Sequence, residues 1–334
     1  MAETFSDIGR IEAIDQLYRL SAYNPVSGLS YTSAKGGRIV TAARMYLEGI
    51  DFNLVYFPLK HLGYKCVVGT VGELYASLAH PRLLNIVLGI SAKLDFPQIK
   101  DLWLGITVAA KEHGFEAVNL DLQPSNNGLF LSVSATGETT LLTDKRRMAA
   151  KSKDLICVSG SLGAAFLGLQ VMERGAKMFH QSGEQPEVAQ YKMLVGAYLR
   201  PELDASVVDR LEDVEIYPSY GYFVTRGLSD ALKRLSRDSG LGAKVYADKI
   251  PFEGNSFQLG KELDMDPVSA AMNGGDDNRL LFVVPILQLE KFRREFQTFD
   301  IIGHLAQPDA GTVLVTPEGV EFPVKAQGWP ENQD

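Results

Sequence analysis

Short apolar runs alternate along this chain with longer stretches in which apolar residues recur at helical spacing. In the first half, runs of strand type occupy residues 38–41, 65–71, 83–91, 117–121 and 129–136. Helical spacing covers residues 5–20 and 96–113, and the second stretch has Pro97 in its first turn and Gly114 just past its end. This alternation predicts an α/β or α+β protein.

The second half continues the alternation. Strands are expected at 154–159, 245–250 and 280–285, helices at 164–174, 228–237 and 287–296, and a closing hairpin at 312–316 and 320–324. Between the halves lies a polar, basic stretch, Thr143 to Lys153, which we interpret as a solvated linker; the alternative is a basic loop that faces phosphate. At roughly 150 residues per domain, we expect two domains, residues 1–148 and 149–334.

Composition narrows the class of protein. The 334 residues include 33 Lys and Arg against 41 Asp and Glu, a formal net charge of −8, which argues against a nucleic-acid partner. The N-terminus shows no signal-peptide pattern, and the longest strongly apolar run, Leu280 to Leu287, is too short to cross a bilayer. Cys66 and Cys157 lie in apolar stretches, as buried thiols of a reducing compartment do. We expect a cytoplasmic protein with no membrane contact.

Common catalytic motifs are absent from the sequence. The five histidines form no H-x-x-x-H pair and none lies near a cysteine, so a zinc site is not expected. The chain contains neither the G-x-S-x-G motif of a serine hydrolase nor a Walker A motif.

Three local features can carry chemistry, and each also has a purely structural interpretation. Gly160 to Gly163 lie between a strand and a helix, where backbone N–H groups can hold an anion, or where glycine permits tight packing. Asn273 to Asp277 pair two glycines with two carboxylates, as a ligand site or a solvated turn would. Asp121 is expected to end a strand, either as a ligand group or as a cap.

Seven segments share their order and spacing with a known family. They are Leu47–Phe52, Pro58–Lys65, Asp154–Gly160, Leu162–Ala165, Asn273–Asp277, Leu280–Phe282 and Lys325–Trp329. Across roughly residues 35–330 they resemble thiamine-monophosphate kinases. The resemblance implies a two-domain fold like that of aminoimidazole ribonucleotide synthetase, with an N-terminal α/β domain and a C-terminal α+β domain. It also implies a homodimer formed by the N-terminal sheet, and the transfer of the γ-phosphoryl group of ATP to thiamine monophosphate with magnesium.

The main departures from the family fall at its metal-binding aspartates. Positions where the resemblance expects such an aspartate hold other residues: Ser27, Arg44, Phe223 and Arg226. Two carboxylates remain at metal positions, Glu73 and Asp121.

The resemblance also assigns ligand contacts. The cofactor-binding residues that it implies are Arg147, Asp121, Gly160, Gly163 and Thr225. The substrate-binding residues that it implies are Asp51, which replaces a histidine, Asp276 and Trp329. In the same segment as Asp276, Asn278 and Arg279 replace a tyrosine and a glutamate of the family.

Arginine in place of aspartate changes the local charge by two units. At about 5 Å from Mg²⁺ a guanidinium is repelled by roughly 6 kcal/mol at an effective dielectric of about 20, and it cannot deprotonate to escape. We therefore hypothesise a binding or regulatory homologue whose Mg²⁺- and ATP-dependent kinase activity is lost or impaired. In it, Arg44 and Arg226 either pair with Glu73 and Asp121 or line an anion pocket with Arg147.

Two alternatives remain open from the sequence. One is an active kinase with a rearranged metal site built from Glu73, Asp121, Asp276 and Asp277. The other is an ATP-dependent enzyme of the same superfamily with another substrate.

Overall fold

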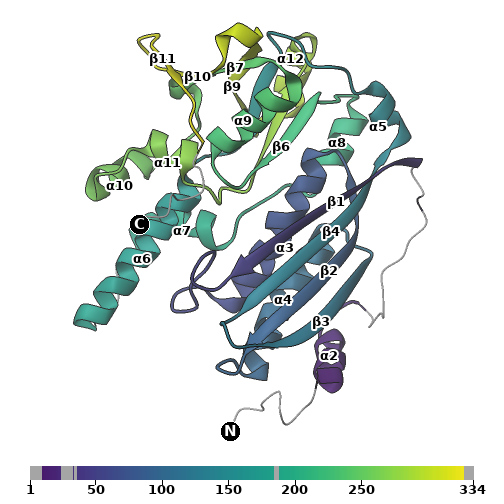
Figure 1. The fold of residues 1–334 in the computed structure, drawn as a ribbon, viewed down its shortest axis with the longest axis vertical. Coiled ribbons are helices and arrows are strands. Elements are labelled where there is room, and N and C mark those ends of the chain that lie inside the picture. The colour runs from purple at the N-terminus through teal and green to yellow at the C-terminus, as the bar shows by residue number, and fades with distance from the viewer. Residues whose placement is uncertain (1–9, 24–32, 34–35, 184–187, 327–334) are drawn as a thin grey trace, which may run out of the picture. The chain divides into compact units, whose positions relative to one another are not determined.

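A computed structural model describes residues 10–23, 33, 36–183 and 188–326. These residues form two compact units (Figure 1). The first comprises the chain up to Lys145 together with Glu202–Asp209, and the second comprises Arg146–Pro201 and everything from Arg210 onward. Both units mix helices with sheets, so the α+β, α/β fold class expected from the sequence is confirmed.

The first unit is a four-stranded sheet with helices on one face. Its strands are β1 (Gly36–Leu47), β2 (His80–Ser91), β3 (Ala117–Ser125) and β4 (Phe130–Thr140), in the order β1-β4-β2-β3. Only β2 and β3 run parallel. The helices are α2 (Arg10–Arg19), α3 (Leu59–Ala76), α4 (Phe96–Glu112) and α5 (Leu141–Arg146), and α3 and α4 lie behind the sheet in Figure 1. On the helix side, Leu84, Ile86, Leu131 and Val133 are fully buried.

Helix α4 forms where the sequence predicted a helix, because its ends are coded locally. The Asp95 side chain accepts from the Gln98 backbone N–H at 2.9 Å while the Gln98 side chain accepts from the Asp95 N–H, so both stabilise the first turn. Gly114 follows the helix at φ +72°, a conformation that glycine adopts without strain.

The strand expected at 65–71 is wrong, since those residues lie inside α3. Fourteen of the 18 residues of this helix are buried, including the middle of its run, Lys65 to Gly72. A helix buried on nearly every side shows no 3.6-residue period, so its apolar run cannot be told from a buried strand. Strand β3 also extends past the predicted limit, which places Asp121 within the strand instead of at its end.

The second unit is built on a seven-stranded sheet in the order β11-β10-β7-β9-β5-β8-β6. Its strands are β5 (Leu155–Ser159), β6 (Tyr220–Val224), β7 (Gly242–Tyr246), β8 (Arg279–Val284), β9 (Phe299–Ala306), β10 (Thr312–Val315) and β11 (Glu321–Pro323). The pairing of β10 with β7 is parallel and the other pairs are antiparallel. The C-terminal hairpin is confirmed as β10 and β11.

The helices that follow Arg146 differ in length. They are α6 (Ala164–Ser182), α7 (Lys192–Leu199), α8 (Val207–Asp213), α9 (Leu228–Ser239), α10 (Ser256–Leu263), α11 (Pro267–Asn273) and α12 (Leu289–Glu295). The strand expected at 245–250 ends at Tyr246, because a 3₁₀ turn occupies Ala247–Lys249. Strand β9 was not expected, because Asp300, Gly303 and His304 interrupt its apolar pattern. Gly303 allows β9 to approach β7 closely, since a Cβ there would lie 2.1 Å from the Lys244 carbonyl oxygen.

In the described part of the chain, no helix is at once long and apolar enough to cross a membrane. Both cysteines are free and buried, as expected from their apolar surroundings.

Candidate functional site

Three loops of the second unit meet at one edge of its sheet. They are residues 159–163 after β5, residues 225–227 after β6 and residues 273–279 before β8, and together we call them the loop cluster. Strands β5 and β6 both lie beside β8 and run antiparallel to it. The ends of β5 and β6 therefore fall at the same edge as the start of β8. Gly160, Gly163, Thr225, Arg226 and Asp276, all singled out from the sequence, come together here.

Hydrogen bonds tie the third loop to both of the others. The Asp276 N–H donates to the Thr225 carbonyl oxygen at 2.8 Å. On the other side, the Leu280 N–H donates to the Ser159 hydroxyl oxygen at 2.9 Å. The segment 273–280 therefore connects the loop after β6 to the loop after β5.

Asp277 makes the most buried of these connections. Its side chain is 3% exposed, and its two carboxylate oxygens accept hydrogen bonds from the Gly163 N–H at 2.8 Å and the Ala165 N–H at 3.2 Å. Burial raises the pKa of Asp277 to about 7. The negative charge of Asp276 also raises this pKa, whereas the two backbone hydrogen bonds and Arg279 lower it. The first turn of α6 thus already holds a carboxylate, so these two N–H groups do not face a ligand in this structure.

The glycines of the first loop serve close packing. Gly163 has φ +75°, and a Cβ there would lie 2.8 Å from the Ala271 backbone nitrogen on α11. Gly160 has φ +77°, and a Cβ there would lie 3.2 Å from the Cζ of Arg279. Any other residue at these positions would have to adopt an unfavourable positive φ, and its Cβ would lie too close to a neighbouring atom.

Two of the replaced metal positions lie on or next to β6. Phe223 is fully buried in the strand, opposite Leu280 of β8. Arg226 is exposed in the loop after the strand. An aromatic ring with no exposed surface offers no oxygen for a cation at this point of the sheet.

Arg147, one of the three arginines of the alternative anion pocket, lies at the other end of β6 from Arg226. Its Nε donates to the Pro218 carbonyl oxygen at 2.9 Å, just before the strand begins. Arg226 follows the opposite end of the strand, whose five residues span about 13 Å at a rise of about 3.3 Å per residue. Within the second unit, Arg147 and Arg226 therefore do not line one pocket.

The first unit holds the other predicted metal positions, on opposite faces of its sheet. Arg44 of β1 pairs in register with Val133, which pairs with Ile86, and both of these are buried on the helix side. Asp121 of β3 pairs with Val87, whose side chain points to the other face.

Arg44 and Asp121 therefore do not pair with each other within this sheet. The Arg44 guanidinium lies 5.0 Å from the Tyr46 ring centre, on the face that α3 covers. Glu73 lies on α3, so an Arg44–Glu73 pair stays a prediction. The carboxylate of Asp121 accepts from the Leu122 N–H at 2.9 Å and from the Gln123 side chain at 3.1 Å.

Asp51 has a structural partner in a turn. Its carboxylate accepts from the Leu47 N–H at 2.8 Å, and its own N–H donates to the Leu47 carbonyl oxygen at 2.8 Å. Ser27 and Trp329, also expected at the site, lie outside the described residues.

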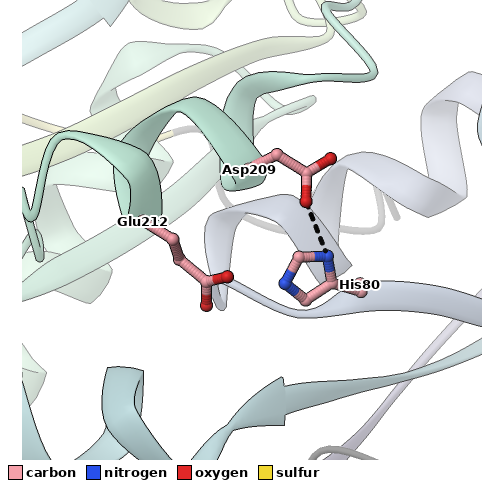
Figure 2. A group of neighbouring side chains, drawn as sticks. All are labelled: His80, Asp209 and Glu212. Carbon is pink, nitrogen blue, oxygen red and sulfur yellow. Dashed lines mark ion pairs between the residues drawn. The ribbon is translucent and has the colours of Figure 1, made fainter.

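One ionisable contact of the first unit was missed from the sequence. The His80 Nδ1 lies 3.3 Å from a carboxylate oxygen of Asp209, and Figure 2 shows this contact with Glu212 one turn further along α8. More than 120 residues separate the pair in sequence, so spacing gave no signal. The side chain of Asp209 is 66% exposed, which makes the contact a weak surface ion pair that requires protonated His80.

Comparison with known proteins identifies several relatives. The model of the AIR synthase related protein N-terminal domain matches residues 29–139. The thiamine-monophosphate kinase of Aquifex aeolicus is 25% identical over 238 residues, which cover 71% of this chain and 73% of that protein.

Solved structures share the whole fold. A structure described as AaThiL complexed with AMPPCP and TMP superposes with a TM-score of 0.69 at 20% identity, over 95% of this chain and 98% of that one. The hydrogenase maturation protein HypE in complex with ATP gives a TM-score of 0.69 at 19% identity, over 97% and 94%.

Proposed function

Because the chain is similar to thiamine-monophosphate kinases and matches the AIR synthase related N-terminal domain, we propose that it belongs to this family, binds ATP without needing Mg²⁺ and acts as a binding or regulatory homologue. Its transfer of phosphate to thiamine monophosphate is then lost or strongly impaired. Similar proteins have been solved with AMPPCP and TMP and with ATP, which supports a nucleotide as the ligand.

The burial of Phe223 carries the proposal. Phosphoryl transfer of this kind depends on metal ions that neutralise the phosphates, and Mg²⁺ takes oxygen ligands in near-octahedral geometry. Phe223 stands where the resemblance expects a ligand aspartate, and its ring is fully buried. Arg44 and Arg226 add positive charge at two further ligand positions. The cofactor contacts that we assign to Gly160 and Thr225 lie together in the loop cluster, whereas Arg147 contacts Pro218 at the far end of β6.

A rearranged metal site is the less favoured alternative, because two of its four carboxylates already accept hydrogen bonds. Both oxygens of Asp277 accept backbone hydrogen bonds, and the carboxylate of Asp121 accepts from Leu122 and Gln123. A cation at either residue would share these oxygens with the existing hydrogen bonds.

Titration calorimetry of the full chain with ATP, with and without Mg²⁺, tests the proposal. We expect the dissociation constant to differ less than threefold between the two conditions, and no thiamine diphosphate to form from thiamine monophosphate and Mg-ATP. Binding that requires Mg²⁺, or turnover of thiamine monophosphate, would contradict it. Absence of ATP binding at millimolar concentration would also overturn it.

Charge reversal at the replaced positions supplies a second arm of this experiment. Arg44→Asp with Arg226→Asp should make ATP binding respond to Mg²⁺, since carboxylates return to two ligand positions. The matched control is Arg38→Asp with Arg237→Asp, which makes the same charge change at arginines whose side chains are 58% and 72% exposed. An equal Mg²⁺ response in both pairs would show a general charge effect instead of a former metal site.

The first unit also supports the expected homodimer. The sheet face away from α3 carries Ile39 and Met45 of β1, which are 63% and 55% exposed. Small residues of β4, including Ser132 and Ser134, lie beside β1 on the same face. An exposed sheet face of this composition suits a second copy of the sheet.

A further inference from the structure

Within the loop cluster, a buried carboxylate connects the start of α6 to the segment before β8. Asp277 lies in the segment before β8, yet its hydrogen bonds go to Gly163 and Ala165, which are 114 and 112 residues away in sequence. The same segment reaches the loop after β6 through the hydrogen bond from the Asp276 N–H to the Thr225 carbonyl oxygen. Asp277 thus fixes the loop after β5 relative to the two others.

The first turn of α6 needs such a partner. The initial N–H groups of a helix have no acceptor within the helix, and they favour negative charge. Gly163, at the N-cap of α6, has no side chain that could accept these bonds. The carboxylate of Asp277 supplies both acceptors and is itself 3% exposed, so water cannot replace it without opening the cluster.

The charged groups that act on Asp277 come from its own segment. Arg279 is the cation, and its Nε also contacts the Ser161 carbonyl oxygen at 3.4 Å. Asp276 is the neighbouring anion. From α6, the groups that face the carboxylate are the two backbone N–H donors.

We propose that Asp277 is a positioning residue: its carboxylate locks the start of α6 to the segment 273–279, and the nucleotide affinity of the loop cluster depends on that lock. The dependence of nucleotide affinity on the lock rests on the proposed function, whereas the lock itself does not. The lock acts through Gly163 and Ala165, and no contact between Asp277 and a ligand is required.

Hydrogen exchange of the full-length protein tests the lock by itself. In Asp277→Ala we expect amide exchange to accelerate at least tenfold both in residues 160–167 and in residues 273–280. The matched control is Asp95→Ala, which removes a carboxylate cap from α4, a helix of similar length in the first unit. That variant should accelerate exchange at the start of α4 only. Unchanged exchange in residues 160–167 of Asp277→Ala would overturn the lock.

Calorimetry with AMPPCP then tests the consequence for the ligand. We expect Asp277→Ala to bind at least tenfold more weakly than the wild type, and Asp95→Ala to bind as the wild type does. Asp277→Asn keeps one acceptor oxygen and should recover part of the affinity, which simple destabilisation of the fold does not predict. Wild-type affinity in Asp277→Ala would overturn the positioning role.

Two further outcomes remain decisive. If the wild type itself binds no nucleotide, the proposed function fails, and the exchange experiment alone decides whether the lock exists. If Asp277→Ala does not fold, Asp277→Asn replaces it, since the amide keeps one acceptor oxygen and loses the other. Wild-type exchange at both the Gly163 and the Ala165 amide of that variant would contradict the lock.

Discussion

At the scale of single residues, the positions where the resemblance expects metal-binding aspartates hold side chains of other charge and shape. Phe223 fills its place in the sheet with no exposed surface, and Arg44 stacks on Tyr46 instead of offering a carboxylate. Asp277, by contrast, stays acidic but is enclosed by backbone donors. Whether a carboxylate can bind a cation therefore depends on what already surrounds it.

Because Asp277 is buried, its contribution to the free energy of unfolding depends on pH. Its pKa is about 7 in the folded chain against an ordinary value of 3.8, so between these values the folded state keeps a proton that the unfolded state has released. The residue's contribution to the free energy of unfolding therefore falls as the pH rises from about 4 to about 7. His113 acts in the opposite sense, because burial lowers its pKa from 6.5 to about 4.

We accordingly expect Asp277→Asn to gain stability relative to the wild type as the pH rises from about 4 to about 7. Urea denaturation at five pH values gives this difference directly. His113→Gln serves as the comparison and should lose stability relative to the wild type over the same range, since it removes a contribution that grows with pH. A difference between Asp277→Asn and the wild type that stays level across the range would refute the assignment.

At the scale of elements, the first unit depends on the close approach of α3 and α4. A Cβ at Gly105 of α4 would lie 1.9 Å from the Lys60 carbonyl oxygen, and one at Gly63 of α3 would lie 2.1 Å from the Leu102 carbonyl oxygen. The helices therefore touch backbone to backbone at both points. This contact buries α3 on nearly all sides, which is why its sequence shows no helical period.

Gly105→Ala should consequently lower the free energy of unfolding by about 2–3 kcal/mol, because backbone atoms must move apart to admit one methyl group. Gly196→Ala in α7 is the matched control, since no atom lies within 4 Å of its added Cβ. That variant should raise stability by up to about 1 kcal/mol through helix propensity. Urea denaturation measures both, and equal effects of the two substitutions would contradict the close approach.

At the scale of the whole molecule, the two units are separate bodies with different roles in the proposed function. The second unit carries the loop cluster, and the first presents an open sheet face. Strand β1 lies at one edge of that sheet and brings Ile39 and Met45 to its surface. Apolar side chains of this exposure on a flat sheet favour association.

Sedimentation velocity of the full chain should show a dimer at micromolar concentration. Ile39→Glu with Met45→Glu should give a monomer, since four charges would enter the dimer interface. Ile50→Glu, at a residue 79% exposed in the turn after β1, is the control and should leave the dimer intact. A wild-type monomer at tens of micromolar would contradict the dimer, and a dimer in the double variant would place the interface elsewhere.

Local sequence alone determined the elements whose signals lie within a few residues. The Asp95 cap, Pro97 and Gly114 define α4, and Pro317 to Gly319 define the C-terminal turn, because caps and turns act over short distances. The glycines and carboxylates of the loop cluster were also recognisable as candidate site residues. Tertiary structure decided the rest. Residues 65–71 lie in a helix that is buried on nearly every side and so shows no helical period, and strand register places Arg44 and Asp121 on opposite faces. Tertiary structure also gave Asp277 its partners more than 110 residues away, which no local pattern records.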